Sequence, residues 1–199
     1  MKWIGLTGGI ACGKTSVAHI LRSEGLVVID ADALAHQALS PGEIGHQKVV
    51  TLFGSHILNE NGSINRKTLG SIVFNNKEDL AKLENIIHPW VQEHVKSLRQ
   101  DLQNKNVPMA FYDVPLLFEK KLQHQFQATI VVACDEIIQL QRLQLRNGFS
   151  KEDALLRIRA QIPLSEKIAQ ASFVIWNNGD LKELHQSVLR VLLDLKNHK

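Results

Sequence analysis

Short apolar runs recur along the chain, bounded by Gly, Pro, Asn or Asp. Three of these runs are rich in β-branched residues, which is typical of strands buried in a parallel sheet. We expect strands at residues 3–7, 26–29, 109–114, 128–133 and 173–176. Helical patterns lie between the runs, and this alternation predicts an α/β fold in three layers, with helices on both faces of a five-stranded parallel sheet.

Two stretches depart from the simple alternation and are expected to be insertions on the core, which comprises residues 1–35, 107–135 and 166–199. Residues 36–106 contain several helical patterns and no strong buried strand. Residues 136–165 form a polar, Arg-rich pair of helical segments, which we expect to be a lid.

Local signals refine both insertions. A helix around residues 77–103 contains Pro89, which predicts a kink or break near His88. In the Arg-rich stretch, Ser150 followed by Asp153 resembles a capping box and predicts that the second helix begins there.

The composition excludes several classes of protein. A length of 199 residues fits one domain with small subdomains, and a formal net charge of +3 is too weak to indicate a nucleic-acid surface. No apolar run approaches the roughly 18 residues that span a bilayer, and no signal peptide is recognisable. We therefore expect a cytoplasmic protein with no nucleic-acid or membrane partner.

Cys12 and Cys134 form no C-x-x-C motif, so neither a disulfide framework nor a zinc site is expected.

The strongest chemical signal is the run GGIACGKT at residues 8–15, which matches G-x-x-x-x-G-K-[ST] at every specified position. In such a loop the backbone N–H groups converge on phosphates at the N-terminus of the next helix. Lys14 would reach the β- and γ-phosphates of ATP, and the Thr15 hydroxyl would bind Mg²⁺. The expected ATP-binding residues here are Gly8, Ala11, Cys12, Gly13, Lys14, Thr15 and Ser16.

A second match to a nucleotide-binding motif does not indicate nucleotide binding. Residues 76–79 read Asn-Lys-Glu-Asp and match the N-K-x-D motif of GTPases. No aspartate in the chain has a glycine three residues later, so the accompanying D-x-x-G motif is absent. We therefore interpret Asn76 as the N-cap of a helix with an acidic first turn.

Two aspartates follow predicted strands, and carboxyl ends of parallel strands line the ligand crevice of an open α/β sheet. Asp32 is expected to act on the hydroxyl of a phosphoryl acceptor, although it could instead cap the helix at residues 33–39. Asp113 is expected to bind Mg²⁺ together with Thr15, although it could instead cap the turn at Pro115.

Positive charge for the transferred phosphoryl group is expected from the Arg-rich stretch. Arg142 and Arg146 are four residues apart and share one face of a helix, and Arg157 lies on the next segment. Guanidinium groups suit phosphate because they donate two parallel hydrogen bonds. We expect all three to bind ATP and Arg142 to take part in catalysis; the alternative is a solvated polar helix face.

Taken together, the chain resembles the dephospho-coenzyme A kinase family over nearly its whole length. The resemblance rests on the order and spacing of short motifs. These are IGLTGGI at 4–10, DAD at 30–32, Asn65-Arg66, IHP at 87–89, DVPLLFE at 113–119, Gln141-Arg142, Arg146, Arg157 with Gln161, and Asn177 with Gly179.

The resemblance implies transfer of the ATP γ-phosphoryl group to the ribose 3′-hydroxyl of dephospho-CoA, the last step of coenzyme A synthesis, with Mg²⁺ accompanying ATP. It implies that Asp32 is the general base and that residues 36–106 form the acceptor domain. Further acceptor contacts implied by the resemblance are Arg66, His88, Leu116 and Glu119. Asn177 is implied to lie near the adenine.

Two alternatives stay open at this point. A P-loop kinase of a nucleoside or nucleoside monophosphate would need the same fold and lid. A nucleotide-dependent switch is of a different class, and the missing D-x-x-G motif argues against its commonest form. The sequence carries no indication of oligomeric state.

The chain also departs from the family pattern. Ala11 and Cys12 stand where relatives usually have Gly and Ser. Because Cys12 would lie beside phosphate at a helix N-terminus, its position predicts a lowered thiol pKa. Ser172 and Trp176 stand where acidic residues are common.

Overall fold

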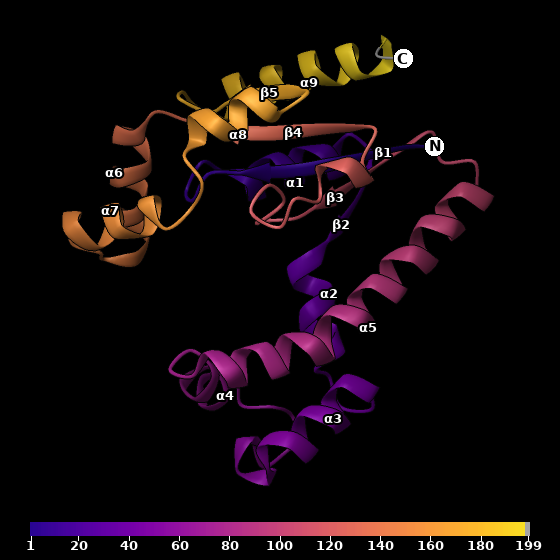
Figure 1. The fold of residues 1–199 in the computed structure, drawn as a ribbon. Helices are drawn as coiled ribbons and strands as arrows, with labels where there is room; N and C mark the ends of the chain where they lie inside the picture. The colour runs from indigo at the N-terminus through magenta and orange to yellow at the C-terminus, as the bar shows by residue number, and fades with distance from the viewer. Residues whose placement is uncertain (198–199) are drawn as a thin grey trace. The chain divides into compact units, whose positions relative to one another are not determined.

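The computed structural model describes residues 1–197, and the chain divides into two compact units. The first comprises Met1–Ile29 with Val107–Lys199, and the second comprises Asp30–Asn106. Figure 1 shows the strands and helices that build each unit. No helix among residues 1–197 is long and apolar enough to cross a membrane.

The first unit is built on a sheet that, within residues 1–197, has five strands in the order β2-β3-β1-β4-β5. The strands are β1 (Lys2–Gly8), β2 (Val27–Asp30), β3 (Met109–Asp113), β4 (Ala128–Ala133) and β5 (Phe173–Trp176). The parallel register places Leu6 of β1 opposite Asp113 of β3, and Gly8 opposite Val132 of β4. The predicted α/β fold is confirmed, and each strand lies within one or two residues of its predicted position.

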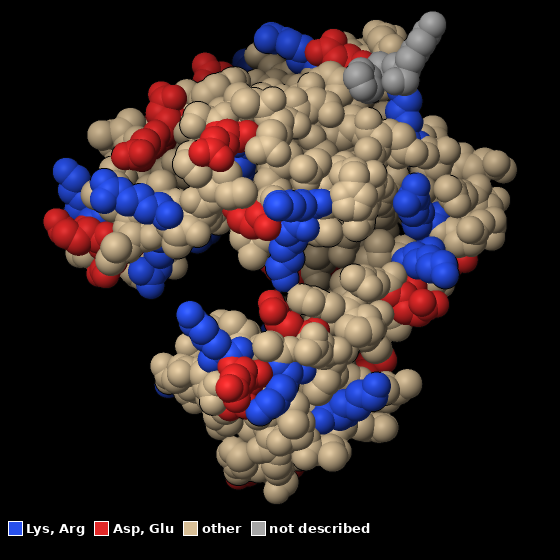
Figure 2. Space-filling model, viewed as in Figure 1, with Lys and Arg blue, Asp and Glu red and all other residues tan. Residues whose placement is uncertain are grey.

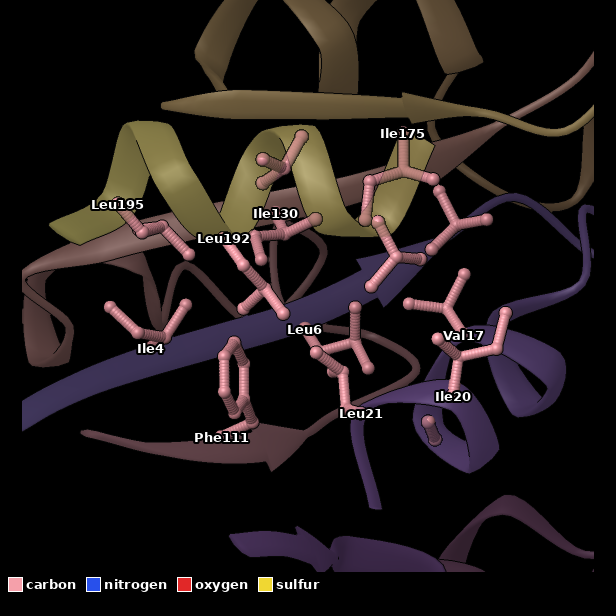
Figure 3. Packing of buried hydrophobic residues seen from close by; sticks show 14 of the residues in the cluster. Ile4, Leu6, Val17, Ile20, Leu21, Phe111, Ile130, Ile175, Leu192 and Leu195 are labelled. Carbon is pink, nitrogen blue, oxygen red and sulfur yellow. The ribbon is translucent and has the colours of Figure 1, made fainter. Parts of the chain in front are cut away.

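Helices α1 (Lys14–Ser23) and α9 (Leu181–Asn197) contact each other on one face of this sheet. Ile4 and Leu6 of β1 are fully buried there, in a cluster with Leu21 of α1 and Leu195 of α9. Figure 3 shows these side chains meeting between β1 and the two helices. Because this core lies beneath the end of β1, it fixes the position of the loop that leads from β1 into α1.

The opposite face is covered by the β3–β4 connection and by α8 (Leu164–Gln170), which contacts β4. A Cβ added at Gly5 would lie 2.6 Å from Leu117 Cδ1, so a side chain at this position would force the connection to shift away from β1. Within this layer the Lys167 side chain is fully buried, and its Nζ lies 2.6 Å from Glu119 Oε1.

Helices α6 (Glu136–Asn147) and α7 (Lys151–Arg159) occupy the stretch predicted as two helical segments. The predicted start of α7 is confirmed, since Ser150 is its N-cap and Ser150 Oγ accepts from the Asp153 N–H at 3.0 Å. Ser150 Oγ also donates to Asp153 Oδ2 at 2.8 Å. Basic and acidic side chains lie next to one another over these helices, at the left of the view in Figure 2.

The second unit is helical. Its helices are α2 (Ala31–Ala38), α3 (Ile44–Phe53), α4 (Arg66–Val73) and α5 (Lys77–Asn104). They enclose a separate core of Val49, Ile57, Ile64, Leu69, Val73 and Leu83. Asn76 caps α5, because its Oδ1 accepts hydrogen bonds from the N–H groups of Glu78 and Asp79. The interpretation of the N-K-x-D match as a helix cap is therefore confirmed.

Of the predicted kink or break near His88, the break is wrong, because α5 continues through Pro89. The kink stays a prediction. Proline removes the N–H that would pair with the carbonyl of Asn85. Both Asn85 and Pro89 are exposed, so water can satisfy that carbonyl, while the packed apolar face around Leu83 and Ile86 holds the helix.

Candidate active site

The P-loop runs from the end of β1 at Gly8 to the start of α1 at Lys14. Two of its residues adopt left-handed backbone conformations, Ala11 with φ 58° and Gly13 with φ 91°. The loop closes on itself through a hydrogen bond from the Cys12 N–H to the Gly9 carbonyl, at 3.1 Å. Turns of this kind at a helix N-terminus gather N–H groups into an anion-binding cradle. Ala11 adopts this conformation although it is disfavoured for a residue with a Cβ.

Side chains from elsewhere in the first unit hold three successive P-loop carbonyls. Gln139 Nε2 donates to the carbonyl of Ile10 at 2.8 Å. Arg142 Nη1 donates to that of Ala11 at 3.4 Å, and Asn177 Nδ2 donates to that of Cys12 at 2.8 Å. Three consecutive carbonyl oxygens are therefore engaged by protein donors.

Two glycines of the loop, Gly9 and Gly13, leave room for these donors. A Cβ at Gly9 would lie 2.9 Å from Gln139 Nε2, and one at Gly13 would lie 2.2 Å from Asn177 Nδ2. Two features therefore favour glycine at position 13: its positive φ and the close approach of the Asn177 amide.

The register of β1 and β3 places the end of β3 beside the P-loop, and there Lys14 Nζ forms an ion pair with Asp113 Oδ1. The Asp113 side chain is 3% exposed. Thr15 is exposed in the first turn of α1. A hydroxyl and a carboxylate near the phosphate cradle are hard oxygen ligands, which suit Mg²⁺.

Of the three predicted lid arginines, the structure brings Arg142 to the P-loop, where Arg142 Nη2 also donates to the Asn177 carbonyl at 3.1 Å. Arg146 is exposed and its Nε donates to Asn147 Oδ1 at 3.0 Å. Arg157 lies over the ring of Phe149, 3.9 Å from its centroid. The ATP contacts of Arg146 and Arg157 stay predictions.

The predicted lowering of the Cys12 pKa is wrong. Cys12 is fully buried, and its Sγ lies 3.3 Å from Sγ of Cys134, which is 2% exposed. The hydrogen bond shared with Cys134 and then burial raise the pKa of the Cys12 thiol well above its ordinary value. The same hydrogen bond lowers the pKa of Cys134.

In the second unit, Asp32 is exposed in the first turn of α2. The alternative that Asp32 caps this helix is wrong, because Asp30 is the N-cap and its Oδ1 accepts from the Ala33 N–H at 3.0 Å. Arg66 is exposed in the first turn of α4, and His88 is exposed on α5. Their predicted roles toward an acceptor stay predictions.

The remaining predicted site residues lie in the first unit. Leu116 is 40% exposed after β3. Glu119 is engaged by buried Lys167, and the side-chain amide of Asn177 is committed to the P-loop. These contacts place Glu119 and Asn177 in the framework of the site, and direct contact with ligands stays a prediction.

The motifs alone did not single out Gln139 or Lys167. Gln139 lies three residues before Arg142 on α6, so the two share a helix face, and that spacing was the available signal. The sequence around Lys167 gives no indication that its side chain is buried, because its partner Glu119 is far away in the sequence.

Comparison with known proteins identifies the family. A family model described as dephospho-CoA kinase matches residues 2–183. This chain belongs to the dephospho-CoA kinase family. A dephospho-CoA kinase of Carboxydothermus hydrogenoformans is 44% identical over 189 residues, covering 95% of this chain and 92% of the relative. One of Geobacillus kaustophilus is 45% identical over 189 residues, covering 95% and 94%.

Solved structures agree with this membership of the dephospho-CoA kinase family. Thermus thermophilus TT1252 superposes with a TM-score of 0.80 at 36% identity, covering 98% of this chain and 97% of its own. A dephospho-CoA kinase from Campylobacter jejuni superposes with a TM-score of 0.73 at 32% identity, covering 97% and 96%. A shikimate kinase from Bacteroides thetaiotaomicron shares the fold, with a TM-score of 0.54 at 15% identity over 98% of both chains.

Proposed function

We propose that this protein transfers the γ-phosphoryl group of ATP to the ribose 3′-hydroxyl of dephospho-CoA, which completes coenzyme A. The observation that carries the proposal is the P-loop at residues 8–15, formed with left-handed turns at Ala11 and Gly13 in a chain of this family. The ion pair between Lys14 and Asp113 also supports the proposal, because it holds the Lys14 ammonium group beside the phosphate-binding loop.

In the proposed reaction the loop N–H groups and Lys14 bind the β- and γ-phosphates. Arg142, already bonded to the loop, adds positive charge over the migrating group. Mg²⁺ bound with ATP would be held by Thr15 and Asp113 and would neutralise phosphate charge. Arg146 and Arg157 would join from a lid at residues 136–165 that excludes water.

Asp32 is proposed to orient the 3′-hydroxyl and accept its proton as the oxygen attacks the γ-phosphorus. Its position in the first turn of α2, directly after β2, and its exposure support this role. Arg66, His88, Leu116 and Glu119 are proposed to bind the acceptor, and Asn177 is proposed to lie near the adenine. A cytoplasmic location, a core of residues 1–35, 107–135 and 166–199, and an acceptor domain at residues 36–106 likewise stay predictions.

The test is ADP release from ATP with a panel of acceptors. We expect rapid ADP release with dephospho-CoA and slow release with no acceptor, with adenosine or with AMP. Preference for AMP or a nucleoside would reject dephospho-CoA in favour of another P-loop kinase. Slow hydrolysis that no acceptor accelerates would favour a nucleotide-dependent switch.

A further inference from the structure

We propose that Gln139 and Gln161 are positioning residues that hold the P-loop in its phosphate-binding form by gripping both backbone polar groups of Ile10. Gln139 Nε2 donates to the Ile10 carbonyl at 2.8 Å, and the Ile10 N–H donates to Gln161 Oε1 at 3.0 Å. The inference deepens the proposed function, because it rests on the binding of ATP by this loop.

The orientation of carbonyl groups decides whether a loop attracts or repels a phosphate. The N–H groups must face the anion, and a carbonyl turned toward it would place two negative atoms together. Gln139 holds the Ile10 carbonyl, while Arg142 and Asn177 hold the next two. The Ile10 N–H is itself bound to Gln161, so Ile10 serves to anchor the loop.

Burial makes the contact of Gln139 costly to lose. Gln139 is 4% exposed, and its amide lies close to Gly9, where a Cβ would approach Nε2 to 2.9 Å. An apolar side chain at position 139 would leave the Ile10 carbonyl without the side-chain donor that now holds it. The carbonyl would then be free to turn, and the cradle would lose its preorganised form.

The two glutamines come from opposite ends of the predicted lid at residues 136–165. Gln139 lies near the start of α6, and Gln161 lies just after α7 ends at Arg159. Both ends of this segment are therefore fixed to one residue of the P-loop. We expect substitutions here to affect ATP more than the acceptor, because both contacts are made to the phosphate-binding loop.

The test uses the full chain with Gln139→Met and Gln161→Met, which keep an unbranched side chain and remove the amide. Gln144→Met is the matched control, because Gln144 is exposed on α6. We would measure ATP affinity by calorimetry, melting temperature without nucleotide, and the separate KM values. Each glutamine variant is expected to weaken ATP binding about tenfold, since a buried hydrogen-bond partner is lost. KM for dephospho-CoA and the control variant are expected to change less than about twofold.

The outcomes are separable. Wild-type-like ATP affinity in folded Gln139→Met and Gln161→Met would overturn the positioning role, as would a lower melting temperature with unchanged affinity. If Gln139→Met does not fold, Gln161→Met decides, because Gln161 is only partly buried. Wild-type protein that binds no ATP would overturn the kinase proposal and this one together; wild-type binding with unaffected variants would overturn this one alone.

Discussion

The ion pair between Lys167 and Glu119 makes a sharp prediction about stability. Lys167 has 0% side-chain exposure and Glu119 has 17%. Among the described residues, the Lys167 Nζ and the two Glu119 carboxylate oxygens have no hydrogen-bond partners beyond this ion pair. Each ion therefore depends on the other to offset its loss of hydration.

The magnitudes follow from this geometry. At a separation of 2.6 Å and an effective dielectric constant of about 20, the attraction is about 6 kcal/mol. Desolvation costs several kcal/mol for each ion, so the pair as a whole is close to neutral. Removal of one partner abolishes the attraction and leaves the other ion buried. We therefore expect Lys167→Met and Glu119→Met each to cost about 3–5 kcal/mol, and the double variant to lie within about 1 kcal/mol of wild type.

The assay is urea unfolding at pH 7, followed by circular dichroism, for the two single variants and the double variant. Lys82→Met is the control, because the Lys82–Asp79 pair on α5 is exposed on its lysine side and is expected to contribute little to stability. The reasoning would be refuted if either single variant lost less than about 1 kcal/mol, or if the two losses simply added in the double variant.

The double variant also separates two roles of Glu119. If Glu119 binds the acceptor as proposed, a folded double variant will show a raised KM for dephospho-CoA. If Glu119 serves only to neutralise Lys167, that KM will match the wild type.

Three further predictions concern the proposed site. Asp32→Asn is expected to lower kcat by about 10²- to 10⁴-fold while ATP affinity, measured by calorimetry, changes less than about twofold; equal turnover would remove Asp32 from the role of base. Gly13→Ala should destabilise the protein by about 2–4 kcal/mol in thermal unfolding, because φ is 91° and a Cβ would lie 2.2 Å from Asn177 Nδ2. Gly25→Ala, with φ 76° and open space around it, should cost only about 1 kcal/mol, so equal losses would contradict the steric argument. For alkylation at pH 8 followed by peptide mass spectrometry, Cys134 should react before Cys12, because its lowered pKa gives more thiolate at a given pH and it lines a pocket of about 430 Å³. Faster modification of Cys12 would show that its pKa is not raised.

The sheet and the P-loop could be predicted because their signals are local. A strand buried on both faces of a parallel sheet is a continuous apolar run, as at residues 128–133. The phosphate loop needs its glycines and lysine at fixed spacing. The break expected at Pro89 was wrong because the packing of α5 in its own core outweighs one lost hydrogen bond at an exposed site.

The rest of the site depends on contacts between distant segments. The pKa of Cys12 is raised rather than lowered because of its hydrogen bond to Cys134 and its burial in the hydrophobic core, and neither is visible in the sequence near residue 12. The contacts of Gln139 with Ile10 and of Lys167 with Glu119 arise in the same way, because α6 and α8 bring these side chains to segments far from them in the sequence. Local sequence patterns predict whether a segment forms a helix, a strand or the phosphate loop, whereas tertiary packing decides which side chains contact each other.

The most direct test of the proposed function is the identity of the phosphorylated product. After incubation with ATP and dephospho-CoA, ³¹P NMR and mass spectrometry would locate the new phosphate. The proposal predicts one new phosphomonoester on the ribose 3′-oxygen, formed in equal amount to ADP. ADP without a phosphorylated acceptor, or a phosphate on any other oxygen, would contradict it.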